Sequence, residues 1–385
     1  MLFCSQSGIG IVAVDLSLLP DAVEVGAVCL DGSPPAYNFD KGSDTGVNHW
    51  LIHLEGGGWC ESKISCAQRS MTYLGSSLKM NKSYDFPGIL SASSKINPYF
   101  YNWNRVLLRY CDGGSFSGNI DAPVLVQLPG ESKARTIYFR GERIWKALVE
   151  HLLLLGMNLA EKALLAGTSA GALASLIHCD SFREFVPIQS EVKCLSDAGF
   201  FIDVVDVGGE RSFRRYFGNV VDTQNITDAL PDTCTQRYGA SQCFFPAQLI
   251  RQIKSPFFIL NAAYDSWQWN NVLVPSSADP KGEWSLCKKN LMSCSTKQVA
   301  ILQEFRKQLV EALGPSTLPI GASSFLLSCV YHNIAFDTRL WATPSSQVGN
   351  KTAAVAVGEW YFEANNKSTL DCPYPCNTNC KGVLL

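Results

Sequence analysis

Short runs of apolar residues separated by turns dominate the hydrophobic pattern of the chain. Those with the length of a buried strand span residues 49–54, 105–110, 163–166, 257–260 and 324–329. Apolar runs of this length that alternate with helical segments and glycine-rich turns are typical of a parallel sheet covered by helices. We therefore predict a largely parallel sheet.

One helix is predicted clearly between the second and third of these runs. In segment 138–155, apolar residues recur at helical spacing, whereas Arg143, Lys146 and Glu150 fall on the opposite side. Gly156 follows directly, and glycine is common at the end of a helix. A strand, a helix and a second strand in this order form the right-handed crossover of a parallel sheet.

The chain shows no internal repeat, low-complexity tract or linker that would separate domains. Two stretches, 205–250 and 275–320, are richer in cysteine, polar and turn residues, and we interpret them as insertions at the rim of the sheet. We interpret residues 1–25 as a leader and residues 26–385 as one domain. The predicted fold class is α/β: an α/β-hydrolase-like, mostly parallel sheet flanked by helices, with disulfide-linked insertions.

Composition excludes two classes of partner. The 385 residues carry a formal net charge of −2, which gives no electrostatic basis for binding nucleic acid or an anionic membrane surface. No apolar run reaches the roughly 18 residues of a membrane-spanning helix, so we predict no membrane span.

The 15 cysteines indicate an oxidising compartment. No Cys-x-x-Cys pair occurs, and no histidine lies near the cysteines of the C-terminal region to complete a zinc site, so we expect no metal. Setting aside Cys4 in the predicted leader leaves an even number, consistent with up to seven disulfides. The alternative is a cytosolic protein with many buried thiols. Three pairs are close enough in sequence to close short loops: Cys60 with Cys66, Cys234 with Cys243, and Cys287 with Cys294.

Glycosylation signals also favour export. Asn-x-Ser/Thr triplets begin at Asn81, Asn225, Asn350 and Asn366. The leader is atypical for a signal peptide, because residues 1–20 contain no Lys or Arg and Asp15 interrupts the apolar stretch. We interpret it as an atypical or truncated signal segment and expect a secreted protein.

The strongest chemical signal is a Gly-x-Ser-x-Gly motif centred on Ser169. An apolar strand precedes Gly167, and a segment able to form a helix follows Gly171. A nucleophilic serine needs this context, because it projects from a strained strand-to-helix turn that the glycines keep free of clashes. We predict that Ser169 is a nucleophile; the alternative is an ordinary turn.

A second motif, Gly56-Gly57-Gly58, follows the strand 49–54. Consecutive glycines leave backbone N–H groups uncovered and able to approach a ligand. An esterase needs such donors for its oxyanion, together with the N–H of the residue after the serine. We predict Gly57, Gly58 and Ala170 as these donors. The alternatives are a flexible loop or a phosphate cradle, but a phosphate loop would have a Lys-Ser/Thr pair.

The base and the acid of a triad follow by elimination. Of the five histidines, only His332 comes after a late strand of the sheet, where hydrolases of this type place the base. Asp265 follows the strand 257–260, between the serine and the histidine in the chain. The remaining candidates are less suited: His49, His53, His151 and His178 as bases, and Asp203, Asp206, Asp232 and Asp337 as acids.

These motifs, in this order, resemble the plant pectin acetylesterases, a family whose animal relatives are the Notum carboxylesterases. The resemblance extends from Gly26 to about Cys380, and its most specific stretches are 54–60, 104–113, 194–201 and 261–268. The chain departs from the family at Thr168 and Ala172, where plant members often have Cys and Gly. Neither departure removes a catalytic group.

The resemblance implies an esterase without metal or organic cofactor that removes acetyl groups from the galacturonosyl residues of cell-wall pectin. It places the triad on Ser169, Asp265 and His332 and the oxyanion loop on Gly57 and Gly58. We also expect a monomer that binds the polysaccharide across the top of the sheet. Aromatic residues beside the catalytic motifs are candidates for stacking on sugar rings, the alternative being core positions: Trp59, Trp267 and Trp269.

Two other functions fit the same residues. One is a Notum-like deacylase of lipids or proteins, which would need a deep apolar pocket. The other is a non-catalytic secreted protein that binds carbohydrate on a hydrolase scaffold. A complete triad argues against the second, because binding alone does not require all three groups.

Overall fold

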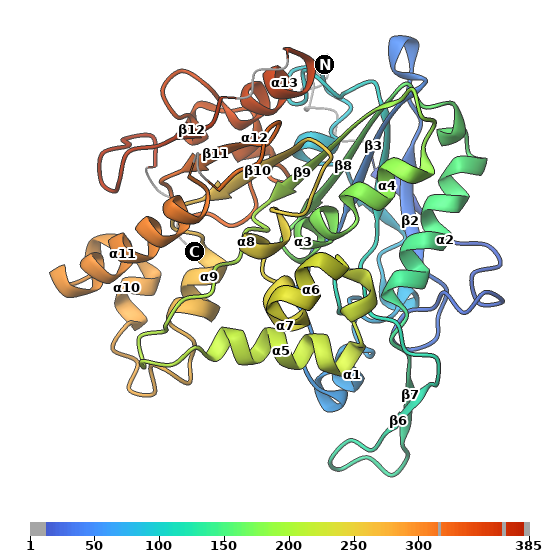
Figure 1. Ribbon diagram of the computed structural model, residues 1–385, viewed down its shortest axis with the longest axis horizontal. Helices are drawn as coiled ribbons and strands as arrows, with labels where there is room; N and C mark the ends of the chain where they lie inside the picture. Colours follow the sequence, from blue (N-terminus) through green and yellow to red (C-terminus); the bar gives the residue numbers. More distant parts are fainter. Residues whose placement is uncertain (1–12, 315–316, 364–366, 381–385) are drawn as a thin grey trace, which may run out of the picture.

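A mostly parallel sheet of ten strands forms the centre of the molecule (Figure 1). The computed structural model describes residues 13–314, 317–363 and 367–380. The strand order is β12-β11-β10-β9-β8-β3-β5-β2-β1-β4; the strands from β12 to β5 are parallel, and the remainder pair antiparallel. The strands of this sheet are β1 (Ala13–Leu18), β2 (Ala36–Asp40), β3 (His49–Leu54), β4 (Ser83–Asp85), β5 (Asn104–Leu108), β8 (Lys162–Thr168), β9 (Glu191–Asp197), β10 (Phe257–Ala262), β11 (Ser323–Leu327) and β12 (Thr369–Leu370).

Helices cover the sheet and build its rim, and β6 (Val124–Val126) and β7 (Arg135–Ile137) form a separate hairpin. The α-helices are α1 (Lys63–Arg69), α2 (Gly141–Leu154), α3 (Ala170–Ile177), α4 (Cys179–Phe185), α5 (Ser212–Gln224), α6 (Asp232–Tyr238), α7 (Ala240–Cys243), α8 (Pro246–Leu249), α9 (Ser266–Gln268), α10 (Ser285–Lys289), α11 (Thr296–Ala312), α12 (Thr338–Trp341) and α13 (Ala353–Glu363). A π-helix, η6 (Trp269–Leu273), continues α9, and short 3₁₀ helices are η1 (Asp44–Gly46), η2 (Ser77–Lys79), η3 (Gly88–Leu90), η4 (Met157–Leu159), η5 (Thr227–Ala229), η7 (Leu291–Ser293) and η8 (Pro344–Ser346).

Both faces of the sheet are buried, by different helices. In β3, Ile52 belongs to the core that contains residues of α2 and α3, whereas Leu51 belongs to the core that contains residues of α12 and α13. Successive strand residues point to opposite faces, so a strand buried on both sides is apolar at nearly every position. This burial explains the continuous apolar runs and confirms the predicted fold class.

The predicted elements are confirmed with small shifts at their ends. The run 49–54 is β3, and the other four runs overlap β5, β8, β10 and β11. The predicted helix begins at Gly141 rather than at residue 138, because the preceding residues follow β7 of the hairpin. Strand β9 was not predicted, since it alternates polar and apolar residues; its Lys193 amine donates to the Tyr361 carbonyl at 2.6 Å.

Part of the predicted leader belongs to the folded domain. Residues Ala13–Leu18 form β1, which pairs antiparallel with β2 and β4. The Asn38 side chain further holds this strand by donating to the carbonyl of Val14 at 2.9 Å. This pairing corrects the expected boundary at residue 26; residues 1–12 lie outside the described residues.

Disulfides link the insertions and the loops around the sheet. Helices α5 to α8, and α10 with α11, lie in the two stretches interpreted as insertions. In Figure 1, α5 and α10 lie away from the central strands, whereas α8 packs beside α3. The three predicted loop-closing disulfides are present, together with Cys29–Cys111, Cys179–Cys194, Cys329–Cys380 and Cys372–Cys376. In the described part of the chain, no helix is long and apolar enough to cross a membrane.

Candidate active site

Ser169 occupies a sharp turn between the end of β8 and the start of α3. Its backbone has φ 58° and ψ −122°, a strained conformation of the kind that is retained at functional sites. The turn fits under the neighbouring strand because Gly171 has no side chain; a Cβ there would lie 2.1 Å from the carbonyl oxygen of Leu54. The strand–turn–helix context expected for Ser169 is therefore present.

Asp265 and His332 form a hydrogen-bonded pair at the ends of neighbouring strands. Asp265 follows β10, and His332 lies in the loop after β11. The Asp265 Oδ2 lies 2.8 Å from His332 Nδ1, and its Oδ1 accepts the backbone N–H of Gln268 at 2.8 Å. Because Asp265 is fully buried, this arrangement fixes the imidazole, with its Nδ1 proton toward the carboxylate.

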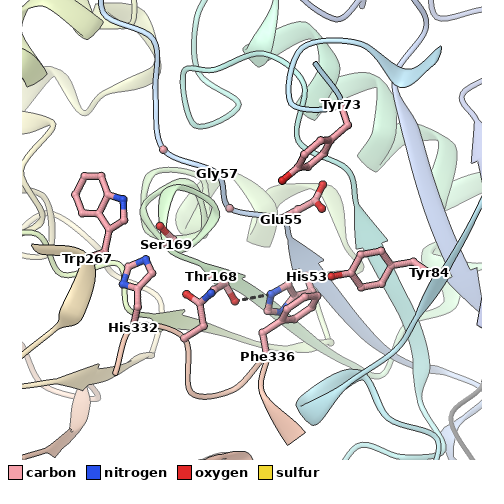
Figure 2. Close-up of a pocket in the computed structure, with 13 residues that line it drawn as sticks. His53, Glu55, Gly57, Tyr73, Tyr84, Thr168, Ser169, Trp267, His332 and Phe336 are labelled. Carbon is pink, nitrogen blue, oxygen red and sulfur yellow. Dashed lines mark hydrogen bonds between the residues drawn. The ribbon is translucent and has the colours of Figure 1, made fainter. Parts of the chain in front are cut away.

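The other imidazole nitrogen faces no partner. His332 Nε2 is buried and makes no hydrogen bond within the described part of the chain. His332 and Ser169 line one pocket of about 310 Å³, together with Gly57 and Trp267 (Figure 2). Its other lining residues are His53, Glu55, Gly56, Gly58, Tyr73, Tyr84, Thr168, Asn333 and Phe336.

The glycine loop passes directly over the Ser169 turn. A Cβ on Gly56 would lie 2.3 Å from the Thr168 carbonyl oxygen and 2.9 Å from Ser169 Cβ, so only glycine permits this approach. The N–H groups of Gly57 and Gly58 donate no hydrogen bond among the described residues. They remain free to bind an oxygen atom in the pocket.

Side chains from three other segments hold the orientation of this loop. Three successive carbonyls each accept one hydrogen bond: Gly57 from Arg69 Nη1 at 2.9 Å, Gly58 from the Tyr110 hydroxyl at 2.9 Å, and Trp59 from the Tyr216 hydroxyl at 2.8 Å. A peptide group is planar, so fixing the Gly57 carbonyl also fixes the direction of the Gly58 N–H. The loop is therefore preorganised before any ligand binds.

Buried groups make this support rigid. Burial raises the pKa of Tyr110 and of Tyr216, which keeps both phenols protonated as donors. The disulfide Cys60–Cys66 ties the end of the loop to α1, the helix that ends at Arg69. None of these supporting residues was predicted as part of the site.

We expect Arg69→Ala to lower kcat for ester hydrolysis by about tenfold, with KM changed less than about twofold. The reason is that Arg69 holds the Gly57 carbonyl, and with it the N–H of Gly58 predicted as an oxyanion donor, without lining the pocket. Steady-state kinetics on a soluble acetyl ester measure this split. Arg183→Ala is the matched control, because Arg183 also donates to loop carbonyls, after α4. A fall in kcat/KM that came entirely from KM would contradict this role.

Asp197, at the end of β9, joins the two halves of the site. Its backbone carbonyl accepts the N–H of Ser169 at 2.9 Å. Its carboxylate accepts the N–H groups of Ile334 and Ala335, at 3.0 and 2.8 Å, in the loop that carries His332. Burial raises the pKa of Asp197 to about 7, although these N–H groups oppose the shift.

This pKa predicts a pH dependence of stability. The folded protein binds the Asp197 proton more tightly than the unfolded chain, in which the carboxyl has a pKa of 3.8. Protonated Asp197 therefore adds to the free energy of unfolding, and this contribution is complete below about pH 4. The contribution is lost as pH rises through about 7. Asp197→Asn cannot ionise, so we expect its denaturant-unfolding free energy to fall less between these pH values than that of the parent. Parallel pH profiles would refute this expectation.

The predicted tryptophans behave differently from one another. Trp267 lines the pocket, and its ring stacks near the imidazole of His332, with centroids 6.1 Å apart. Trp59 and Trp269 are only 6% and 1% exposed and have no free ring face for a sugar. The structure corrects the expectation for these two, because apolar neighbours, including Phe201 and Phe217 around Trp59, enclose them.

Residues that were considered less suited as the acid or the base of the triad contact other groups. Asp203 forms ion pairs with Arg211 and Arg214. The Asp206 carboxylate accepts the backbone N–H groups of Gly208 and Glu210 in the loop that follows it. His53 lines the pocket, and its Nε2 lies 2.8 Å from the hydroxyl of Thr168. Burial lowers the pKa of His53 to about 3, so its ring is neutral. Among the described residues, no cluster of acidic, Cys and His side chains could hold a metal ion.

Comparison with known proteins assigns the family. The pectinacetylesterase model matches residues 10–381. The chain belongs to the pectinacetylesterase family. Pectin acetylesterase 7 of Arabidopsis thaliana is 44% identical over 377 residues, covering 97% of this chain and 94% of the relative. This membership makes the protein a carboxylic ester hydrolase.

Animal carboxylesterases are also similar to this chain. The palmitoleoyl-protein carboxylesterase NOTUM of Mus musculus is 25% identical over 396 residues, covering 92% of this chain and 70% of the mouse protein. The crystal structure of the Wnt deacylase Notum from Drosophila superposes with a TM-score of 0.78 at 23% identity, over 96% of this chain and all of that chain. This likeness supports the α/β-hydrolase-type architecture.

Proposed function

We propose that this protein is a secreted serine esterase that removes acetyl groups from pectin. The observation that carries the proposal is the arrangement at one edge of the sheet. A strained serine and a free imidazole nitrogen line the same pocket, beside a loop in which side chains hold the carbonyls of Gly57, Gly58 and Trp59. This arrangement provides a nucleophile, a base and oxyanion donors.

In the proposed reaction, His332 Nε2 takes the proton of Ser169 as its Oγ attacks the acetyl carbonyl carbon. The N–H groups of Gly57, Gly58 and Ala170 stabilise the negative charge of the tetrahedral intermediate. His332 then gives the proton to the sugar oxygen, which leaves, and an acetyl-enzyme remains. Water, activated by the same imidazole, releases acetate, while Asp265 holds the imidazole and stabilises its charge without taking the proton.

The surroundings of Ser169 support a small acyl group. Next to the glycine loop, the buried Trp59 indole packs edge to face against Phe201, Phe217, Phe244 and Trp267. Most residues that line the adjoining pocket carry polar groups. A long acyl chain would need a deep apolar pocket, which argues against the Notum-like alternative. An acetyl ester on a polar sugar suits these surroundings.

The plant relatives support pectin as the substrate, because their names record that activity. Secretion to the cell wall is proposed on two further grounds. The seven disulfides are typical of an oxidising compartment. The glycosylation acceptors that fall within the described residues, Asn81, Asn225 and Asn350, are all exposed.

Acetate release tests the substrate. Purified protein is incubated with acetylated pectin, acetylated xylan and chitin at equal ester or amide content, and acetate is quantified over time. The proposal requires the initial rate on pectin to exceed the other two by about tenfold or more, equivalent to about 1.4 kcal/mol of transition-state discrimination. Equal rates on pectin and xylan would disprove pectin specificity, although they would leave the esterase assignment intact.

A further inference from the structure

A second hollow shares one lining residue, Trp267, with the Ser169 pocket. It has a volume of about 270 Å³ and is formed by the start of α5, by η6 and by the segment that follows η6. Its lining residues are Ser212, Phe213, Tyr216, Trp267, Asn271, Pro275 and Ser277. None of these side chains takes part in the bond-making steps of the proposed hydrolysis.

The lining combines the partly exposed rings of Tyr216 and Trp267 with uncharged polar groups. Phe213 and Tyr216 stack with centroids 5.8 Å apart, and Trp267 packs edge to face against Phe213. On the rim, Asn271 and Ser277 are exposed. The Asn271 amide donates to the Trp267 carbonyl at 2.9 Å, while its own oxygen and the Ser277 hydroxyl have no partner in the described part of the chain.

This chemistry matches a sugar ring. A pyranose has an apolar C–H face that packs on aromatic rings and an edge of hydroxyls that exchange hydrogen bonds with amides and hydroxyls. The volume lies near the lower end of the range for ligand sites, which suits a short piece of a glycan. Since no lining residue is charged, a uronate bound here would keep its carboxylate in solvent.

Trp267 connects the hollow with the reaction. Trp267 lines the Ser169 pocket, where Figure 2 shows it beside His332, and it also lines the hollow, so the two sites adjoin. A polymer with one residue in the pocket could therefore place a neighbouring residue in the hollow. We propose that the hollow is a glycan subsite, which binds a pyranose residue neighbouring the acetylated one in the same chain. The inference rests on the proposed function, because that function supplies the polymeric substrate.

Competitive inhibition tests the subsite without requiring hydrolysis of the polymer. The Ki of unacetylated oligogalacturonide is measured against hydrolysis of p-nitrophenyl acetate, for the parent and for Asn271→Leu and Ser277→Trp. We expect both variants to raise Ki about fivefold or more. Asn271→Leu removes roughly one hydrogen bond to the sugar, and Ser277→Trp fills the space that the sugar would occupy. Their kcat/KM for p-nitrophenyl acetate should stay within about twofold of the parent, because this ester needs only the Ser169 pocket. Asn158→Leu, before β8 at the opposite edge of the sheet, is the matched control and should change neither value.

The outcomes separate this proposal from the function on which it rests. Unchanged Ki in both variants, or a parent that oligogalacturonide does not inhibit, would overturn the subsite. A change on p-nitrophenyl octanoate without a change in Ki would show that the hollow receives an acyl chain, which also overturns it. A parent that oligogalacturonide inhibits, but that releases no acetate from acetylated pectin, would refute the proposed function and leave the sugar site standing.

Discussion

Ser169→Ala is expected to lower kcat for hydrolysis of an acetyl ester by on the order of 10⁴-fold or more. The variant loses only the hydroxyl oxygen. Its Cβ, the backbone turn at φ 58° and the packing of α3 against the sheet are retained. The remaining rate would come from the oxyanion donors and from binding alone. Steady-state assays with p-nitrophenyl acetate measure the loss directly.

Two comparisons make this result specific. Ser181→Ala, in α4, removes a hydroxyl that donates to the carbonyl of His178 outside the pocket, and it should keep nearly all of the activity. Circular dichroism and thermal unfolding should place Ser169→Ala close to the parent, so that lost activity is not lost folding. Activity of Ser169→Ala within tenfold of the parent would end the nucleophile assignment.

Asp265→Asn is expected to lower kcat by about 10⁴-fold while the fold is kept. Asparagine has the same shape and can still accept the Gln268 N–H that Asp265 Oδ1 accepts. Its NH₂ group would then face His332 Nδ1 across the present 2.8 Å contact, and two donors cannot bond. The imidazole would carry its proton on Nε2, the nitrogen that must be free to receive the proton of Ser169.

The control for this variant is a carboxylate in an ion pair outside the site. Asp203→Asn removes the partner of Arg211 and Arg214 and should leave kcat within about twofold. The measurement is kcat against pH for both variants and the parent. If Asp265→Asn kept more than about a tenth of the parental kcat, the acid of the triad would have to be sought elsewhere.

Sequence reasoning could name the candidate reactive groups because each depends on a local pattern. The Gly167-to-Gly171 motif needs its own flanking strand and helix, and Asp265 and His332 each follow an apolar strand. The chain order of the three residues then matched a known arrangement. These are properties of short segments, so they could be predicted before any tertiary contact was known.

The groups that hold the site could not be predicted in this way. Tyr216 reaches the carbonyl of Trp59 from an insertion, at a separation of 157 residues. Asp197 lies in 194–201, one of the stretches on which the family resemblance rests. Its partners Ile334 and Ala335 are nevertheless more than 130 positions away in the chain. Such roles depend on how distant segments pack, for which the chain carries no local signal.

Burial of aromatic residues shows the same limit. Trp59 stands next to the glycine loop and was a candidate for stacking on a sugar, with a core position as the alternative. The insertion that contains α5 and α7 instead brings Phe217 and Phe244 against that ring, which makes it part of the core. Proximity in sequence to a catalytic motif therefore did not decide which side the ring faces.

Covalent trapping tests the central claim most directly. An organophosphonate ester inactivates serine esterases by forming a stable bond to the nucleophilic oxygen, and peptide mass spectrometry then locates it. The account predicts a single adduct on Ser169, formed in step with loss of activity, and none in His332→Ala. Complete inactivation with the label on another residue, or with Ser169 unmodified, would contradict it.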